Sequence, residues 1–150
     1  MIEIETIMST DLVTVTPEDT VERARVLMHD RRIHHLPVVN GNDEIVGLVT
    51  LSNVLAATDS FLRDEGSRIH PDQIRIADIM VADVVTVDQH AGIRQAALFL
   101  EKHRIGCLPV VSDGKLTGII TDTDFVGVAI NLLEQMEWSE PDEQDVQEIA

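Results

Sequence analysis

The sequence is poor in several residue types on which particular protein classes depend. It contains one cysteine and no tyrosine, and its aromatic side chains are three phenylalanines and one tryptophan. Because Cys107 has no partner for an internal disulfide, a disulfide-stapled secreted framework is excluded and a reducing, cytoplasmic location is expected. The core must be built from aliphatic side chains, and a chain of this length can bury roughly 70% of its unfolded surface.

Basic residues and long apolar runs are also scarce. The chain has 11 Lys+Arg against 27 Asp+Glu, which gives a formal net charge of -16. No apolar run is long enough to span a membrane, and residues 1–5 lack the basic and apolar regions of a signal peptide. A field this negative repels phosphate backbones and anionic lipids, so neither nucleic acid nor a membrane is expected as a partner.

The negative charge is concentrated near the C-terminus. No Lys or Arg follows Lys115, whereas acidic residues continue to the end of the chain. From about Trp138 onward the composition is typical of a solvated segment, and residues 136–150 are predicted to form a disordered acidic tail. The acidic residues after Lys115 are Asp122, Asp124, Glu134, Glu137, Glu140, Asp142, Glu143, Asp145 and Glu148.

The chain contains an internal repeat with an offset of 72 positions. At this offset Met8–Val39 aligns with Met80–Val111, and twelve of the 32 aligned positions are identical. Removing one residue from the loop after Val39 brings Gly47–Thr50 onto Gly118–Thr121. Each copy is too small to bury a sufficient core alone, so the two are expected to share one core across a pseudo-two-fold axis. The predicted organisation is repeat 1 at 1–62, a linker at 63–75, repeat 2 at 76–135 and the tail at 136–150.

Local patterns within each copy predict the order β-α-β-β-α. Residues 12–16 alternate apolar and polar side chains as a strand does, and Asp19 with Glu22 forms a capping-box pattern for the following helix. Two strands around a Gly-containing turn come next, and Ser52 is expected to cap the second helix. The predicted fold class is therefore α+β, with two tandem β-α-β-β-α repeats packed as a pseudo-two-fold pair. Strands are predicted at 12–16, 36–39, 44–49, 84–87, 108–111 and 116–120, with helices from Asp19 and at 52–62, 93–103 and 123–134.

Two motifs occur in both copies at matching spacing. The first is Ile-x-x-Leu-Pro-Val-Val at 33–39 and 105–111, and the second is Gly-(Leu/Ile)-(Val/Ile)-Thr-x-(Ser/Thr)-(Asn/Asp) at 47–53 and 118–124. Over about residues 4–134 the chain resembles a pair of CBS (cystathionine-β-synthase) domains, and it is similar to stand-alone bacterial pairs of the acetoin-utilisation (AcuB-like) type. The resemblance implies a regulatory module that forms a flat homodimer and binds adenine nucleotides or S-adenosyl compounds in clefts between the repeats.

The last predicted helix begins with residues that suit a nucleotide. Free backbone N–H groups at a helix start favour an anion, the Thr121 and Thr123 hydroxyls can donate to a phosphate, and the Asp124 carboxylate can accept from ribose hydroxyls. These positions match the family's ribose-phosphate motif, although Thr123 or Asp124 could serve only as a helix cap. In the family the adenine lies against the other repeat, where Ile33 offers it an apolar face. Ile33 could equally be a core residue. The resemblance thus implies a first cleft of Thr14, Thr16, Ile33, His35, Thr121, Thr123 and Asp124.

Pseudo-symmetry implies a second, weaker cleft. Here Asn53 stands where the family carries an aspartate. Its neutral amide can hydrogen-bond a ribose hydroxyl, but without the charge assistance that a carboxylate gives. In the first cleft, Gly106 and Cys107 stand where phosphate-binding members often carry a basic residue. AMP, ADP or an S-adenosyl compound is therefore favoured over ATP, and an empty, structural cleft stays open as an alternative. The residues expected in the second cleft are His34, Thr50, Ser52, Asn53, Thr86, Ile105 and Cys107.

Metal binding and catalysis are not predicted. His34, His35, His103 and Cys107 are not accompanied by a Cys-x-x-Cys motif or a spaced histidine pair, so no metal site and no required cofactor are expected. Neither Cys107 with His103 nor Asp122 with Asp124 forms a nucleophile-base-orienter set, so no catalytic residue is assigned and the chain is not expected to be an enzyme.

Two functions remain at this point. The first is a regulatory module that senses an adenosine-containing ligand between its repeats and transmits binding through a dimer to an unknown protein partner. The alternative is a structural or protein-interaction dimer with empty clefts, whose acidic tail docks on a basic partner.

Overall fold

The computed structural model describes residues 1–63 and 70–138. Part of the predicted linker, 64–69, and most of the predicted tail, 139–150, lie outside the described residues. The elements are the 3-10 helix η1 (Ile4–Thr6), α1 (Val21–Arg31), β1 (His35–Val39), β2 (Ile45–Thr50), α2 (Leu51–Arg63), the 3-10 helix η2 (Ile76–Asp78), β3 (Val87–Asp88), α3 (Ile93–His103), β4 (Cys107–Ser112), β5 (Lys115–Thr121) and α4 (Asp122–Glu137).

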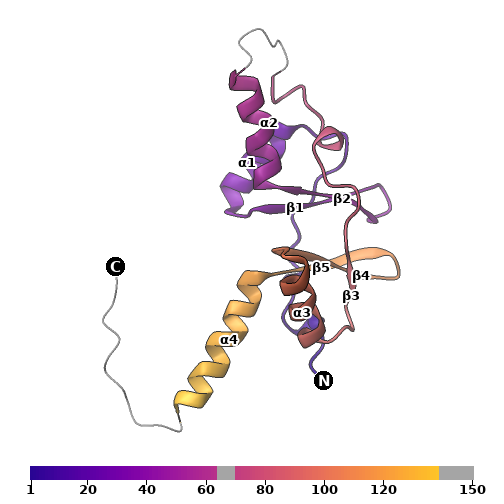
Figure 1. Ribbon diagram of the computed structural model, residues 1–150. Helices are drawn as coiled ribbons and strands as arrows, with labels where there is room; N and C mark the ends of the chain where they lie inside the picture. The colour runs from indigo at the N-terminus through magenta and orange to yellow at the C-terminus, as the bar shows by residue number, and fades with distance from the viewer. Residues whose placement is uncertain (64–69, 139–150) are drawn as a thin grey trace, which may run out of the picture.

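Each repeat is built around an antiparallel hairpin. In β1–β2, Pro37 lies opposite Leu48, and in β4–β5 Pro109 lies opposite Ile119. The two sheets lie one above the other, with α1 and α2 on the outer side of the first sheet and α3 on the outer side of the second (Figure 1). The inner faces of the two hairpins are therefore turned toward each other. These findings confirm the tandem α+β architecture.

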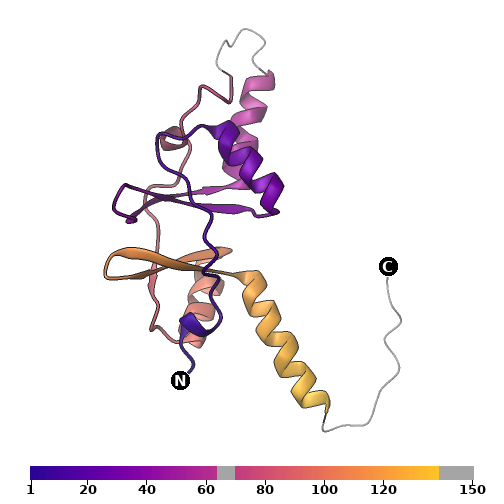
Figure 2. The same ribbon diagram turned by 180° about the vertical axis from the view of Figure 1, so that it is seen from behind.

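The first strand of each copy is shorter than predicted. Residues 12–16 contain only an isolated parallel bridge, between Val15 and Val38. In the second copy the strand is Val87–Asp88 rather than 84–87, and it pairs in parallel with β4. The predicted strands are therefore too long: in 12–16 only Val15 pairs with a neighbouring strand, because the residues before it cross from one repeat to the other (Figure 2).

Two of the predicted helix caps are wrong. Helix α1 is capped by Thr20, whose side chain accepts from the Arg23 N–H at 3.2 Å, whereas Asp19 accepts from the Thr16 N–H at 2.8 Å. Helix α2 begins at Leu51, so Ser52 lies within its first turn. Its cap is Thr50, whose Oγ1 accepts from the Asn53 N–H at 3.2 Å. Helix α4 extends to Glu137, three residues beyond the predicted end.

The described residues form two hydrophobic cores instead of the single shared core that was expected. The first gathers side chains of α1, β1, β2 and α2, and the second gathers side chains of α3, β4 and β5. The two repeats are joined by an exchange of segments. Ile4, near the N-terminus, is fully buried in the second core, and Ile76, which follows the first repeat, is fully buried in the first. These isoleucines are related by the repeat offset of 72.

Backbone contacts hold both exchanged segments in place. The Ile4 N–H donates to the Ala91 carbonyl and the Ile76 N–H donates to the Asp19 carbonyl, each at 2.8 Å. Each segment then forms a bridge with the neighbouring hairpin, Ser9 with Ile119 and Val81 with Leu48, before it crosses to its own repeat. Within the part of the chain that the structure describes, no helix combines the length and apolar character needed to cross a bilayer.

Candidate functional site

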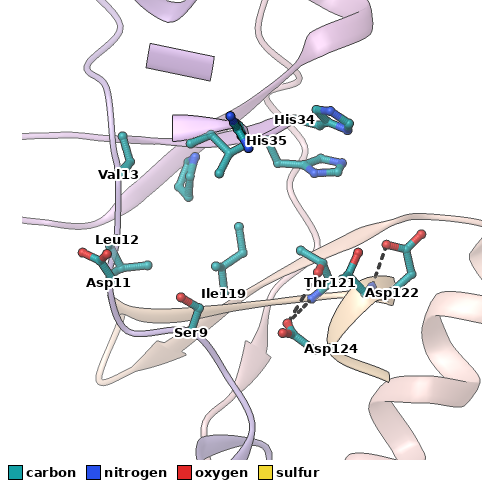
Figure 3. Close-up of a pocket in the computed structure, with 14 residues that line it drawn as sticks. Ser9, Asp11, Leu12, Val13, His34, His35, Ile119, Thr121, Asp122 and Asp124 are labelled. Carbon is teal, nitrogen blue, oxygen red and sulfur yellow. Dashed lines mark hydrogen bonds between the residues drawn. The ribbon is translucent and has the colours of Figure 1, made fainter. Parts of the chain in front are cut away.

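A cavity of about 340 Å³, called cavity 1, lies between the two repeats. Its walls come from the crossing N-terminal segment, from the residues that lead into β1, and from the junction of β5 with α4 (Figure 3). The volume lies within the range of small-molecule sites. Cavity 1 is lined by Ser9, Asp11, Leu12, Val13, Arg32, Ile33, His34, His35, Pro37, Ile119, Thr121, Asp122, Thr123 and Asp124.

The start of α4 supplies hydroxyl and carboxylate groups to cavity 1. Asp124 Oδ2 accepts from the Thr121 N–H at 2.8 Å and from the Thr121 hydroxyl at 3.5 Å, and Asp122 Oδ1 accepts from the Thr123 N–H at 2.9 Å (Figure 3). Asp124 is thus a helix cap. Because an ionised carboxylate has about four lone-pair sites, this cap leaves Asp124 further capacity to accept hydrogen bonds.

Two adjacent histidines form the opposite side of the cavity. His34 is exposed, while His35 is half-buried at the start of β1. Burial lowers the pKa of His35 below its ordinary value, and the negative charge of Asp122 opposes that shift. His35 is therefore largely neutral at pH 7 and offers a hydrogen-bonding imidazole rather than a cation.

Formal charges around cavity 1 are mainly negative. Asp11, Asp122 and Asp124 contribute carboxylates, and Arg32 contributes a guanidinium. Arg32 is the C-cap residue that follows α1, and its backbone is left-handed, with φ of 54°. Cavity 1 therefore presents a cation on one side and carboxylates on the others.

A second cavity, cavity 2, has a volume of about 290 Å³. Most of its lining is related to cavity 1 by the repeat offset, but it has no counterpart of the carboxylates at 122 and 124. His35 lines both cavities. The residues around cavity 2 are His35, Leu48, Thr50, Val81, Asp83, Val84, Val85, Ile105, Gly106 and Cys107.

Cys107 is a buried wall residue of cavity 2. Burial raises the pKa of its thiol to about 12, and Asp122 and Asp124 add to the rise. The thiol is consequently protonated at neutral pH, and it lacks the thiolate character that a reactive cysteine needs.

A family model described as CBS domain matches residues 4–60 and 76–131. The chain belongs to the CBS domain family. As a CBS pair it is similar to the crystal structure of AcuB from Vibrio cholerae, a protein named for acetoin utilization, with 39% identity and a TM-score of 0.78 over 94% of this chain and 99% of the other. It is also similar to CBSX2, solved in complex with AMP, with 27% identity and a TM-score of 0.76 over 89% and 99% of the two chains.

The CBS pair also matches parts of larger proteins. It is 38% identical to inosine-5'-monophosphate dehydrogenase of Thermoplasma acidophilum over 123 residues, which are 81% of this chain and 22% of the enzyme. The chain therefore spans less than a quarter of the length of this curated relative.

Most residues predicted for the first cleft of the CBS pair line cavity 1. Thr14 and Thr16 do not, because Thr16 is tied by its N–H to Asp19 at the turn before α1, and Val15 between them is buried against β1. The predicted residues that line cavity 1 are Ile33, His35, Thr121, Thr123 and Asp124.

The prediction for the second cleft differs more from the structure. Thr50, Ile105 and Cys107 line cavity 2, whereas His34 lines cavity 1 instead. Ser52, Asn53 and Thr86 line neither cavity. The Asn53 side-chain oxygen accepts from the Thr50 N–H and hydroxyl, both at 2.9 Å, so this amide serves as a cap.

The crossing segments are the part of the site that sequence reasoning missed. Ser9, Asp11, Leu12 and Val13 line cavity 1, and the residues 72 positions later, at 81 and 83–85, line cavity 2. The signal was present in the repeat alignment, because Asp11 is identical to Asp83 and Val13 to Val85.

Proposed function

We propose that this CBS pair is a non-enzymatic regulatory module that binds an adenosine-containing ligand in cavity 1. The observation that carries the proposal is the composition of the cavity, which joins apolar walls from both repeats to a helix start with hydroxyl and carboxylate groups. CBSX2, a related CBS protein, was solved in complex with AMP. The composition of cavity 1 suits an adenosine compound as well.

Each part of adenosine has a matching wall. Ile33 and Ile119 offer apolar surface from opposite repeats, between which a purine can lie. Asp124 can accept from the ribose hydroxyls, and Thr123 can donate to a 5′ substituent at the start of α4. His35 supplies a neutral imidazole beside them. This arrangement requires residues of both repeats.

The charges of cavity 1 select among adenosine compounds. A triphosphate would bring several negative charges close to Asp11, Asp122 and Asp124, with Arg32 as the balancing cation. AMP carries fewer charges, and the sulfonium of an S-adenosyl compound is attracted by the carboxylates. We therefore expect AMP, ADP or an S-adenosyl compound to bind more tightly than ATP.

A ligand in cavity 1 would act by changing how the repeats pack. Because it contacts both of them, it favours the relative arrangement in which both contacts are made. A cytoplasmic protein partner would then recognise the altered surface of a homodimer. In this proposal no chemical step is required of the chain, and cavity 2 is a weaker site.

Asp124→Asn tests the proposal without removing the cap of α4. In the first repeat Asn53 already caps α2 through its side-chain oxygen, so an asparagine at 124 can hold Thr121 in the same way. Loss of the charge should weaken the ribose contact, and we expect about a tenfold lower affinity for AMP or S-adenosylmethionine by calorimetry.

Asn53→Asp is the matched control, because it exchanges the same residue types at the related cap and lies outside both cavities. Its affinity for the ligand at cavity 1 should equal that of the wild type. If no member of a panel of AMP, ADP, ATP, S-adenosylmethionine and NAD raises the melting temperature of the wild type, cavity 1 is not an adenosine site.

A further inference from the structure

Two glutamates and a histidine converge on the surface of the second repeat. His90 Nδ1 lies 3.1 Å from Glu3 Oε2 and 3.9 Å from Glu5 Oε1, and one ligand atom from each residue lies within 4.8 Å of the others. His90 Nε2 lies 3.5 Å from the Gln89 amide, so Nδ1 is the ring nitrogen that faces the carboxylates. These three side chains are called the His90 cluster below.

Backbone hydrogen bonds hold the His90 cluster together. The Ile4 N–H, between the two glutamates, donates to the Ala91 carbonyl at 2.8 Å. The Glu5 N–H donates to the Gln89 carbonyl at 3.2 Å, and the His90 N–H donates to Asp88 Oδ1 at 2.9 Å. These backbone bonds therefore hold Glu3 and Glu5 beside His90, although His90 lies at least 85 positions later in the chain.

The first repeat contains the same backbone frame with different side chains. At the repeat offset, the Ile76 N–H donates to the Asp19 carbonyl and the Ala77 N–H donates to the Pro17 carbonyl, at 2.8 and 3.0 Å. In this frame Arg75 takes the place of Glu3, and its Nη1 donates to the Glu18 carbonyl at 2.6 Å. Glu18 corresponds to His90.

The two repeats differ in the charge at this position, which is Arg75 in the first repeat's frame and Glu3 in the second's. In the first repeat, a side-chain cation joins the exchanged segment to the loop before α1. In the second repeat, two carboxylates and the His90 imidazole meet at the related position, so the positive charge there comes from a proton on the imidazole or from a metal ion that replaces that proton. The three side chains are 38%, 44% and 60% exposed, which leaves the position accessible.

We propose that Glu3, Glu5 and His90 bind one divalent transition-metal ion of the Zn²⁺ type. Zinc is bound by imidazole nitrogen and carboxylate oxygen, and three protein ligands leave a fourth position for water. Two carboxylates neutralise its charge, and the imidazole favours Zn²⁺ over Mg²⁺ or Ca²⁺, which prefer oxygen ligands. This site differs from the histidine and cysteine grouping for which the sequence offers no metal-ligand motif.

Metal binding would fasten the N-terminal segment to the second repeat. The segment continues from Glu5 to Ser9, which forms a bridge with Ile119 and lines cavity 1. An ion that binds only the folded chain stabilises it, by an amount that grows with the logarithm of the ion concentration once that exceeds the dissociation constant. Zinc should therefore raise the melting temperature, and it should do so through a contact remote from the carboxylates of cavity 1.

Calorimetric titration of the untagged chain with ZnCl₂ tests the proposal. We expect one Zn²⁺ per chain, and His90→Ala and Glu3→Gln should each weaken its binding by at least about tenfold. His29→Ala is the matched control, since His29 is an exposed histidine 3.3 Å from the Asp30 carboxylate on α1. This variant should bind zinc as the wild type does.

Thermal unfolding with and without Zn²⁺ gives an independent readout. The wild type should melt at a higher temperature with zinc, while His90→Ala should melt at the same temperature in both conditions. The proposal is overturned if the wild type binds no zinc, or if His90→Ala and Glu3→Gln bind it as tightly as the wild type does, since the metal would then lie elsewhere.

Discussion

Gly118 in β5 is covered by the side chain of Met8 from the crossing segment. A Cβ at Gly118 would overlap Met8 Sδ and lie 3.1 Å from the Ser9 carbonyl oxygen. The same arrangement occurs in the first repeat, where a Cβ at Gly47 would lie 2.5 Å from Met80 Sδ. Each glycine thus allows a methionine of the exchanged segment to lie flat on the hairpin.

Gly118→Ala should therefore destabilise the protein. The methionine could move aside, but the Ser9 backbone is held by its bridge with Ile119, so we expect a loss of about 1–3 kcal/mol in the free energy of unfolding. Gly127→Ala is the control, because among the described residues a Cβ there meets no side chain and no backbone outside its own helix within 4 Å, and alanine favours a helix. Urea unfolding measures both variants, and an unchanged midpoint for Gly118→Ala would contradict the overlap.

At the residue scale, the sequence predicts side chains that belong to local motifs and misses those brought in from elsewhere. Thr121, Thr123 and Asp124 follow one another at a helix start, so their place beside one cavity could be predicted from local spacing together with the resemblance to CBS domains. Ser9 and Asp11 reach cavity 1 only because their segment crosses to the other repeat. The alternation of apolar and polar residues does not reveal that crossing, because an extended segment shows the same alternation beside either sheet.

At the scale of elements, each exchanged segment contributes a buried side chain to the core of the other repeat. Ile4→Ala should lower the free energy of unfolding by about 2–5 kcal/mol, because its side chain is fully buried in the second core. Hydrogen exchange should then accelerate at Val110 and Ile120 more than at Val38. Ile2→Ala, at a residue that is 64% exposed, should leave exchange unchanged. Equal acceleration in both repeats would show that the two cores unfold as one.

The helices and hairpins were easier to predict than the first strands. Helix periodicity and the Leu-Pro-Val-Val motif are local signals, and both hairpins formed close to the predicted ranges. A strand, in contrast, exists only where a neighbour accepts its hydrogen bonds. Val15 has such a neighbour in Val38, and the residues before it do not belong to a strand.

At the scale of the whole molecule, α4 leaves an apolar surface uncovered. None of its residues is buried, and it extends away from the other helices (Figure 1). Val126, Ile130 and Leu133 are spaced to share one face of the helix, and each is at least half exposed. A stripe of this kind is expected to pack against another protein surface, and the proposed homodimer provides one.

Ile130→Asp should convert the proposed dimer into a monomer. An aspartate in the middle of the stripe would have to be desolvated on association, which we expect to cost about 2 kcal/mol or more. Asn131→Asp adds the same charge at the next residue, which points away from the stripe, and it should remain dimeric. Light scattering after size-exclusion chromatography gives the mass of each variant, and a monomeric wild type would contradict the dimer.

The position of α4 also couples the proposed dimer to cavity 1. The helix begins with the cavity residues at 122–124 and continues directly into the stripe, so one rigid element carries both surfaces. If a ligand shifts the start of α4, it also moves Ile130. By linkage, AMP or S-adenosylmethionine should then change the dimer dissociation constant of the wild type, and the monomeric Ile130→Asp chain should bind that ligand with a correspondingly altered affinity.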